Sequence, residues 1–326
     1  MTSVLVTGGA GFLGSNLAER LLAEGFHVRI YRRATSDLRA VAGLPVEHIV
    51  GDILDRDAIA RAVRGCDTVF HAAAVVSHNA RDRAIVQEVN VTGTRNVVEG
   101  CLEGGVRRLV HISSVAAAGT PKNGEIANEE TPFDWEGPPG YKLSKYQAEK
   151  EVAKGISRGL DAVMVNPSVI VGERDIHFHG GQLIRAARRG LLLFCVPGGM
   201  NVVYVGDVVR GTIEAARRGK TGERYLLCGE NLTHREIFAR TARIVGGIPP
   251  VIQLPLPLLH AAARTTEALC NFLHVTPWLT EDLVANAGAV NWFSSEKAIR
   301  ELGYTITPFD QTIMAAFRWY RKNGLL

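Results

Sequence analysis

The stretch SVLVTGGAGFLG at residues 3–14 decides the fold of this chain. Its apolar first half predicts a buried strand, and the leucines that continue at helical spacing predict a helix. Between the two, Gly8 permits a tight turn, Gly11 lets backbone N–H groups approach a pyrophosphate, and Gly14 lets the helix pack closely against its strand. The positive end of the helix dipole favours an anion at the same place. The stretch therefore predicts a dinucleotide-binding turn, the alternative being a glycine turn that serves the fold alone.

Apolar runs and helical patterns alternate along the first half of the chain. The expected strands are residues 4–7, 28–31, 46–50, 68–72, 108–113 and 162–166, and the expected helices are residues 12–24, 55–64, 84–103 and 141–155. Strands that are apolar throughout are typical of a parallel sheet covered on both faces. The sequence thus predicts an α/β protein with a Rossmann-type, doubly wound parallel sheet.

The alternation becomes irregular after residue 172. We therefore expect a dinucleotide-binding Rossmann core at residues 1–172 and, mainly, a smaller substrate-binding lobe at residues 173–326. Residues 201–218 read as a strand-like run followed by a helix and are expected to return to the core.

Composition excludes several classes of protein. The 326 residues are 46% hydrophobic and 21% charged with a formal net charge of +4, and their short runs of lysine and arginine give no nucleic-acid footprint. Five cysteines, odd in number and set in apolar surroundings, favour reduced thiols over disulfides or a metal site, and hence a cytoplasmic protein. The start of the chain shows no signal-peptide pattern, and no stretch reaches the roughly 18 apolar residues of a membrane span.

The most apolar late segment is residues 251–275. It mixes prolines and leucines with a few polar positions, which predicts a helical wall of the substrate lobe. An amphipathic helix that lies on a membrane surface is the alternative.

The end of the second strand bears on the choice of dinucleotide. A carboxylate there binds the adenosine ribose and repels a 2′-phosphate, whereas an arginine accepts that phosphate. Arg32 and Arg33 occupy this place and no acid occurs before Asp37, which favours NADP(H) over NAD(H) unless both arginines are merely solvated. After the third strand, Asp52 is a candidate acceptor for the adenine amino group and Ile53 for packing on the ring. A helix N-cap is the alternative for Asp52.

Tyr141 and Lys145 are four residues apart on a predicted helix and therefore share a face. An ammonium beside a phenol favours the phenolate and lowers the phenol pKa, as a proton donor and acceptor for a carbonyl or alcohol requires. Ser114 follows the strand at residues 108–113, at the carboxyl edge where ligands of open α/β sheets bind, and its hydroxyl can hold a substrate oxygen. Each feature alone is weak, but their order along the chain makes the combination specific.

Together these motifs resemble the extended short-chain dehydrogenases/reductases along nearly the whole chain. The matching stretches are residues 7–14, 51–53, 70–74, 90–94, 113–114, 141–145 and 166–168. The resemblance implies that Tyr141 is the general acid/base, that Lys145 tunes it and binds the nicotinamide ribose, and that Ser114 orients the substrate.

The resemblance also implies a set of contact residues. The implied cofactor contacts are Gly8, Gly11, Phe12, Leu13, Gly14, Arg32, Arg33, Asp52, Ile53, Ala72, Ala73, Ala74, Tyr141, Lys145, Pro167 and Val169. The candidate substrate contacts are Val75, His177, Phe178 and His179, of which the last three are placed on loop position, with exposed loop residues as the alternative. No third ligand at a suitable spacing supports a metal at the two histidines. Asn90 matches a helix asparagine for which a structural hydrogen bond to the sheet is an equal interpretation.

Within the family, the stretch at residues 199–207 lacks the arginine that helps nucleotide-sugar enzymes bind a diphosphate. Arg32, residues 201–204 and residues 229–233 are more similar to the dihydroflavonol-reductase and 3β-hydroxysteroid-dehydrogenase branch and to hopanoid-associated epimerase-like proteins. The expected function is an NADP-dependent oxidoreductase that interconverts a ketone or aldehyde and an alcohol by hydride transfer. Residues 191–194 and 254–259 favour a fairly apolar small-molecule substrate.

Two other functions stay open from the sequence. One is a nucleotide-sugar epimerase or dehydratase that retains its NAD(P), and the other is a non-catalytic NADP(H)-sensing protein. The intact Ser114, Tyr141 and Lys145 argue against a pure sensor. The resemblance further implies a homodimer through the helices at residues 84–103 and 141–155.

Overall fold

The computed structural model of the chain describes residues 2–77, 79–121, 124–134, 137, 140–272 and 281–326. Seven parallel strands form the main sheet in the order β10-β6-β5-β4-β1-β2-β3. Their bounds are β1 Ser3–Thr7, β2 His27–Arg32, β3 Glu47–Val50, β4 Thr68–His71, β5 Arg108–Ile112, β6 Ala162–Pro167 and β10 Arg224–Leu227. The strand order reverses between β1 and β4, which opens the crevice where such sheets bind ligands. The prediction of a Rossmann-type sheet is confirmed.

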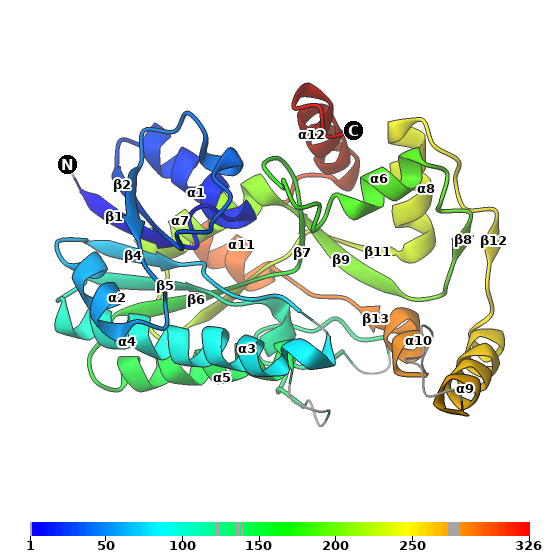
Figure 1. Cartoon of the computed structure of the whole chain (residues 1–326), viewed down its shortest axis with the longest axis horizontal. Coiled ribbons are helices and arrows are strands. Elements are labelled where there is room, and N and C mark those ends of the chain that lie inside the picture. Colours follow the sequence, from blue (N-terminus) through cyan, green and yellow to red (C-terminus); the bar gives the residue numbers. More distant parts are fainter. Residues whose placement is uncertain (1, 78, 122–123, 135–136, 138–139, 273–280) are drawn as a thin grey trace.

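Helices cover both faces of this sheet (Figure 1). On one face lie α1 Phe12–Ala23, α7 Val205–Arg218 and α11 Glu296–Leu302, and on the other lie α2 Arg56–Val63, α4 Gly93–Glu103 and α5 Tyr141–Ile156. Alternate side chains of β1 enter the two cores, Val4 and Val6 on the α1 face and Leu5 on the other. Because the inner strands are covered by helices on both faces, their sequences are mostly apolar.

Two elements of this domain differ from expectation. Residues 84–103 were predicted as one helix, but α3 Arg83–Gln87 is separated from α4 by a wider π-helical turn at Glu88–Thr92. Strand β10 was not predicted, because it is short and begins with a charged residue. Short 3-10 turns occur at Arg39–Val41, Ala80–Asp82 and Val115–Ala117.

A second, smaller group of elements lies beyond the carboxyl ends of the main strands (Figure 1). Its sheet has the order β11-β9-β13, with β7 pairing β9, and a separate pair joins β8 to β12. The bounds are β7 Val169–Val171, β8 Phe194–Cys195, β9 Gly199–Tyr204, β11 Glu230–Thr233, β12 Ile252–Gln253 and β13 Val290–Asn291. The helices are α6 Gln182–Arg188, α8 His234–Val245, α9 Leu256–Phe272, α10 Glu281–Gly288 and α12 Phe309–Lys322.

Residues 201–218, expected to return to the core, are divided between the two groups. Strand β9 belongs to the small sheet, whereas α7 packs on the main sheet through Val208 and Ile213. Of the expected helical segment at residues 251–275, α9 accounts for the part that ends at Phe272, and residues 273–275 lie outside the described residues. None of the helices in the described ranges has the length and apolar character that a membrane crossing requires.

Candidate active site

The glycine turn after β1 has the shape that a pyrophosphate requires. Gly8 has a positive φ of 67°, and a Cβ atom there would lie 2.8 Å from the Ala73 Cα atom. A Cβ on Gly14 would collide with the Gly8 carbonyl oxygen, so only glycine at position 14 lets the helix pack this closely against the turn. Helix α1 starts at Phe12 with no side-chain cap and no acid in its first turn, which leaves its N–H groups for an anion. These residues fit the diphosphate of a dinucleotide.

The arginines at the end of β2 are held in place. Arg32 Nε donates a hydrogen bond to His48 Nδ1 at 2.9 Å, and its guanidinium also binds the Arg33 carbonyl oxygen at 3.1 Å. The nearest acid along the chain, Asp37, binds the Arg39 guanidinium at 2.6 Å. This arginine lowers the pKa of the half-buried Asp37 carboxyl to about 2. Positive charge therefore dominates the place where an adenosine ribose would lie.

The two residues after β3 have different surroundings. Asp52 is exposed and accepts a hydrogen bond from the Leu54 N–H at 2.9 Å, while Asp55 is the residue that caps α2. The N-cap alternative for Asp52 is therefore wrong. Ile53 is buried and packs against Gly93 of α4, so little of its side chain faces outward.

Buried His71, at the end of β4, joins the glycine turn to α4. Thr94 donates its hydroxyl hydrogen to the Asn90 carbonyl oxygen at 2.6 Å, so His71 Nε2–H must be the donor in its 3.0 Å bond to Thr94. His71 Nδ1 then accepts from the Thr7 hydroxyl at 2.8 Å, and Thr7 accepts from the Ala73 N–H at 3.3 Å. Burial lowers the pKa of His71 to about 3, which keeps it neutral. Sequence reasoning missed this residue.

The loop after β4 is fixed from the π-helical turn. The Asn90 side chain accepts from the Val75 N–H at 2.8 Å, donates to the Val75 carbonyl oxygen at 3.0 Å, and donates to Ser144 of α5 at 2.9 Å. Asn90 therefore makes structural hydrogen bonds, but to the loop after β4 and to α5 and not to the sheet, where the structural alternative placed them. Of the candidate contacts on this loop, Ala72 and Val75 are half-buried and Ala74 is exposed.

Ser114, Tyr141 and Lys145 come together at the carboxyl end of β5. The Ser114 hydroxyl oxygen accepts from the Ala116 N–H at 3.1 Å, which leaves its O–H free to donate. Ser114 hydrogen-bonds the Tyr141 phenol, and this bond opposes the effect of burial on the phenol pKa. Lys145 is buried and its Nζ donates to the Ile112 carbonyl oxygen at 2.9 Å.

The charges of these groups differ from the sequence expectation. Burial raises the pKa of Tyr141 above its ordinary value despite the Ser114 hydrogen bond, so the expected lowering by Lys145 is wrong for this arrangement. Lys145 directs its ammonium at a backbone carbonyl instead of lowering the phenol pKa. Burial also lowers the pKa of Lys145 to about 8, against the opposing effect of the Glu149 carboxylate.

A buried polar layer supports these residues from below. Asn166 Nδ2 donates to the Ser114 carbonyl oxygen at 2.9 Å and to Glu149 Oε1 at 2.6 Å, and Glu149 pairs with Arg224 at 3.1 Å. Among the described residues, the buried polar atoms without a hydrogen-bond partner include those of His111, Ser113 and Asn166 on or next to β5 and β6, while others, on Thr212, His234, Thr241 and Trp292, lie elsewhere in the fold. Sequence reasoning missed Glu149, although its spacing of four from Lys145 was a signal.

Strand β6 of the main sheet ends at Pro167, and β7 of the small sheet begins at the exposed Val169. Between them, the Ser168 hydroxyl donates to Asn201 Oδ1 of β9 at 2.6 Å. The predicted nicotinamide contacts thus lie where the main sheet passes into the small sheet.

The loop that carries the candidate substrate contacts is organised by Asp175. Its buried carboxylate accepts from the N–H groups of residues 179–181 and from the Tyr320 hydroxyl. Phe178 has a positive φ of 56° and stacks on Tyr320 with ring centroids 4.7 Å apart, while His177 and His179 are exposed. Phe178 therefore packs within the lobe. Of the three candidate substrate contacts on this loop, only His177 and His179 have exposed side chains.

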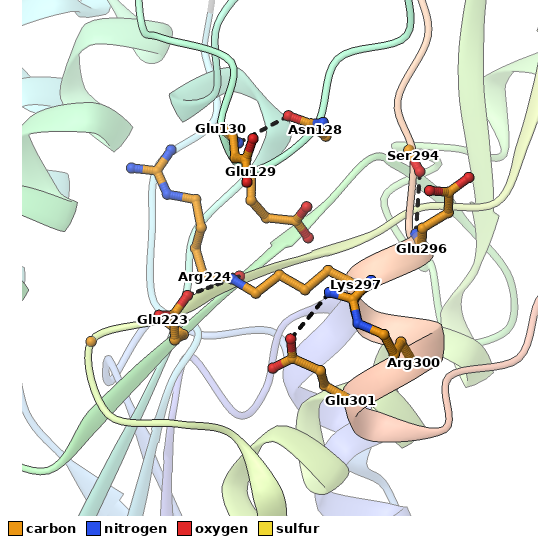
Figure 2. Close-up of a pocket in the computed structure, with 11 residues that line it drawn as sticks. Asn128, Glu129, Glu130, Glu223, Arg224, Ser294, Glu296, Lys297, Arg300 and Glu301 are labelled. Carbon is orange, nitrogen blue, oxygen red and sulfur yellow. Dashed lines mark hydrogen bonds and ion pairs between the residues drawn. The ribbon is translucent and has the colours of Figure 1, made fainter.

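A cavity of about 520 Å³ lies at the amino end of β10, away from these residues (Figure 2). Its charged lining includes Glu129, Glu223, Arg224, Lys297, Arg300 and Glu301. Lys297 Nζ binds the Arg224 carbonyl oxygen at 2.9 Å, and Glu129 accepts from the Leu226 N–H at 2.8 Å. These side chains cap the free edge of the sheet, and ligands of such sheets bind at the opposite, carboxyl ends. The cavity is therefore separate from the candidate active site.

Metal ligands are not gathered in the described ranges, where no three His, Cys, Asp or Glu side chains form a group that would hold an ion. The cysteines are buried and unbridged.

Comparison with known proteins agrees with this geometry. The family model described as NAD dependent epimerase/dehydratase family matches residues 4–228. A protein of Synechocystis sp. that carries the provisional name dihydroflavonol 4-reductase is 36% identical over 326 residues, covering 98% of this chain and 94% of that protein. Sterol demethylase protein B of Methylococcus capsulatus is 34% identical over 327 residues, covering 99% and 100%. The crystal structure of gox2253 superposes with a TM-score of 0.91 at 38% identity and covers 100% of both chains. This chain is therefore a member of the NAD dependent epimerase/dehydratase family and an NAD(P)-dependent enzyme of the extended short-chain dehydrogenase/reductase type.

Proposed function

We propose that the protein is an NADP-dependent oxidoreductase that interconverts a ketone or aldehyde and an alcohol, with Tyr141 as the general acid/base. The observation that carries this proposal is the hydrogen bond between Ser114 and Tyr141 beside the buried Lys145. The three groups lie at the carboxyl edge of the sheet, next to the loop held by Asn90. A phenol and a hydroxyl at hydrogen-bond distance offer two contacts to one substrate oxygen.

In the reductive direction, Ser114 and Tyr141 hold the carbonyl oxygen and polarise the carbonyl group. Tyr141 gives its proton to that oxygen as hydride reaches the carbon. The resemblance implies that Lys145, one helical turn from Tyr141 on the same face, binds the nicotinamide ribose. A bound nicotinamide supplies the hydride, or accepts it when the alcohol is oxidised.

The cofactor preference rests on the end of β2. Arg32 is half-buried and is oriented by His48, and Arg33 adds a second cation, which is exposed. The Asp37 carboxylate is already bound by Arg39, so it does not repel a phosphate as a free carboxylate would. We place the cofactor on residues 1–172, with the contacts that the resemblance implies, and the substrate mainly on residues 173–326.

The proposed substrate is an apolar, ring-bearing ketone or secondary alcohol. Two relatives that match nearly the whole chain carry names that refer to a dihydroflavonol and to a sterol. Both names describe polycyclic compounds with an oxygen on a ring carbon, which is the group that the Ser114–Tyr141 pair is suited to hold.

The test is oxidation of NADPH and of NADH by purified protein across steroidal, flavonoid, aliphatic and aromatic ketones and aldehydes. Wild type is compared with Tyr141→Phe and with Tyr146→Phe, a matched change on the same helix in a ring that stacks on Phe133. Turnover that is lost only in Tyr141→Phe supports the proposal. Conversion of a nucleotide sugar without net oxidation of cofactor would replace it with the epimerase alternative.

We also propose that the protein forms a homodimer through α4 and α5. These helices lie side by side on the outer face of the sheet. Light scattering after size-exclusion chromatography tests this, and a monomer at assay concentration would contradict it.

A further inference from the structure

Large apolar side chains are concentrated on one surface of the smaller group of elements. Of the fourteen exposed large apolar side chains in the described residues, six lie in two short segments and are 51% to 72% exposed. They are Leu191, Phe194, Ile248, Val251, Ile252 and Leu258, and we call them the apolar patch. Contiguous apolar surface on a protein of this kind marks a site of interaction.

The pairing of β8 with β12 brings the two segments together. Phe194 lies opposite Ile252 in this pair, and the N–H groups of Val251 and Ile252 both donate to the Leu193 carbonyl oxygen. Leu258 follows at the start of α9. Figure 1 shows β8, β12 and α9 together at the end of the molecule farthest from the amino terminus.

Arginines border the apolar patch, and the two chain segments that form the patch contain no acidic side chains. Residues 176–206 and 237–266 contain no Asp or Glu, but they contain Arg185, Arg188, Arg189, Arg240, Arg243 and Arg264. In the described part of the chain, the ion pairs of this group involve only Arg240 and Arg264. Arg188 lies over the Phe317 ring but has no carboxylate partner among the described residues, so Arg188, Arg189 and Arg243 are the arginines that can bind an external anion. A Cβ on Gly247 would touch the Ala187 carbonyl oxygen, so the ends of α6 and α8, and with them these arginines, are adjacent.

We propose that the apolar patch and its arginines dock the protein on the surface of an anionic lipid bilayer. Exposed apolar side chains enter the boundary between headgroups and acyl chains, while arginines bind lipid phosphates. A second copy of the chain fits this surface less well, because a twofold contact would place the same patch against itself and arginine against arginine. The lipid test uses no substrate, so its outcome is independent of the reaction proposed above.

The experiment is cosedimentation of the full chain with vesicles of phosphatidylcholine alone and of phosphatidylcholine mixed with phosphatidylglycerol. We expect binding to the mixed vesicles that weakens as salt is added. Neutralising Arg188, Arg189 and Arg243 to glutamine is expected to lower binding about fivefold for each arginine, which corresponds to about 1 kcal/mol each.

The apolar part is tested with Val251→Ser/Leu258→Ser, which is expected to reduce vesicle binding while NADPH binding stays at the wild-type level. The matched control is Ile299→Ser/Ile306→Ser, a pair of exposed apolar residues outside the patch. Binding that is equal in the patch variant and the control, or absent in wild type, overturns the proposal. A wild-type dimer that the patch variant converts to a monomer would instead assign the surface to a contact between copies, and also overturns it.

Discussion

Replacing Asp175 by alanine is expected to release the loop after β7 and to lower the free energy of unfolding by about 3–5 kcal/mol. The carboxylate is 1% exposed. It accepts hydrogen bonds from the N–H groups of His179, Gly180 and Gly181 at 2.9, 2.8 and 3.0 Å, and from the Tyr320 hydroxyl at 3.0 Å. A hydrogen bond to a charged group contributes about 1.5–3 kcal/mol, and the donors are partly able to find water once the loop opens, so the sum is not simply additive.

The assay is urea unfolding followed by circular dichroism, with wild type, Asp175→Ala and two comparison variants. Tyr320→Phe removes a single bond to the carboxylate and is expected to cost about 1.5–3 kcal/mol. Asp37→Ala removes a half-buried surface carboxylate whose partner is the exposed Arg39, and no measurable change is expected. A loss below about 1 kcal/mol for Asp175→Ala, the size of a surface ion pair, would refute the reasoning that this buried carboxylate holds the loop.

Further outcomes follow from the active-site geometry. Tyr141→Phe should lower turnover by about 10²- to 10⁴-fold, the usual contribution of a general acid, and leave NADPH affinity, measured by fluorescence, nearly intact. Arg32→Asp should weaken NADPH binding at least about tenfold more than NADH binding, since a charged hydrogen bond to the 2′-phosphate is lost, and equal losses would count against the phosphate role. The pKa of Lys145 is about 8, so the rate should fall as the pH rises above that value and the ammonium is lost. Because this pKa is lowered from 10.5, the unfolded chain binds more protons between about pH 8 and 10.5, and Lys145 destabilises the fold less as the pH rises through that window. Glu149→Gln should move the alkaline fall in rate to lower pH, because the Glu149 carboxylate raises the pKa of Lys145. The control is Glu151→Gln, which replaces another buried carboxylate on the same helix. Glu151 pairs with Arg95, so this variant should leave the pH of the fall unchanged.

The fold was predictable because its signals are local. The turn at Gly8 needs a positive φ, and the change from apolar runs to leucines at helical spacing marks the passage from strand to helix. The same local information placed Ser114 at a strand end and put Tyr141 and Lys145 on one face of a helix. Each of these residues lies where the sequence predicted, although their contacts with cofactor and substrate stay predictions.

What the sequence did not reveal depends on contacts between distant residues. The π-helical turn within residues 84–103 coincides with the Asn90 side chain, whose partners lie on another loop and another helix. Asp175 is bound by Tyr320, which is 145 residues away, and Glu149 by Arg224 on the edge strand. No pattern within a window of sequence distinguishes such buried carboxylates from exposed ones.

The charges at the active site were likewise predictable only where they depend on local sequence. The spacing of Tyr141 and Lys145 correctly predicted a shared face, but the direction of the phenol pKa depended on burial, which the spacing does not encode. In the structure the phenol pKa is raised and the Lys145 ammonium binds the Ile112 carbonyl oxygen, so Tyr141 holds its proton at neutral pH. In the proposed reaction, a protonated phenol is the form that donates to a carbonyl oxygen. Under the proposed mechanism, oxidation of an alcohol requires that proton to leave Tyr141 first, so alcohol oxidation should depend more strongly on pH than reduction of the ketone.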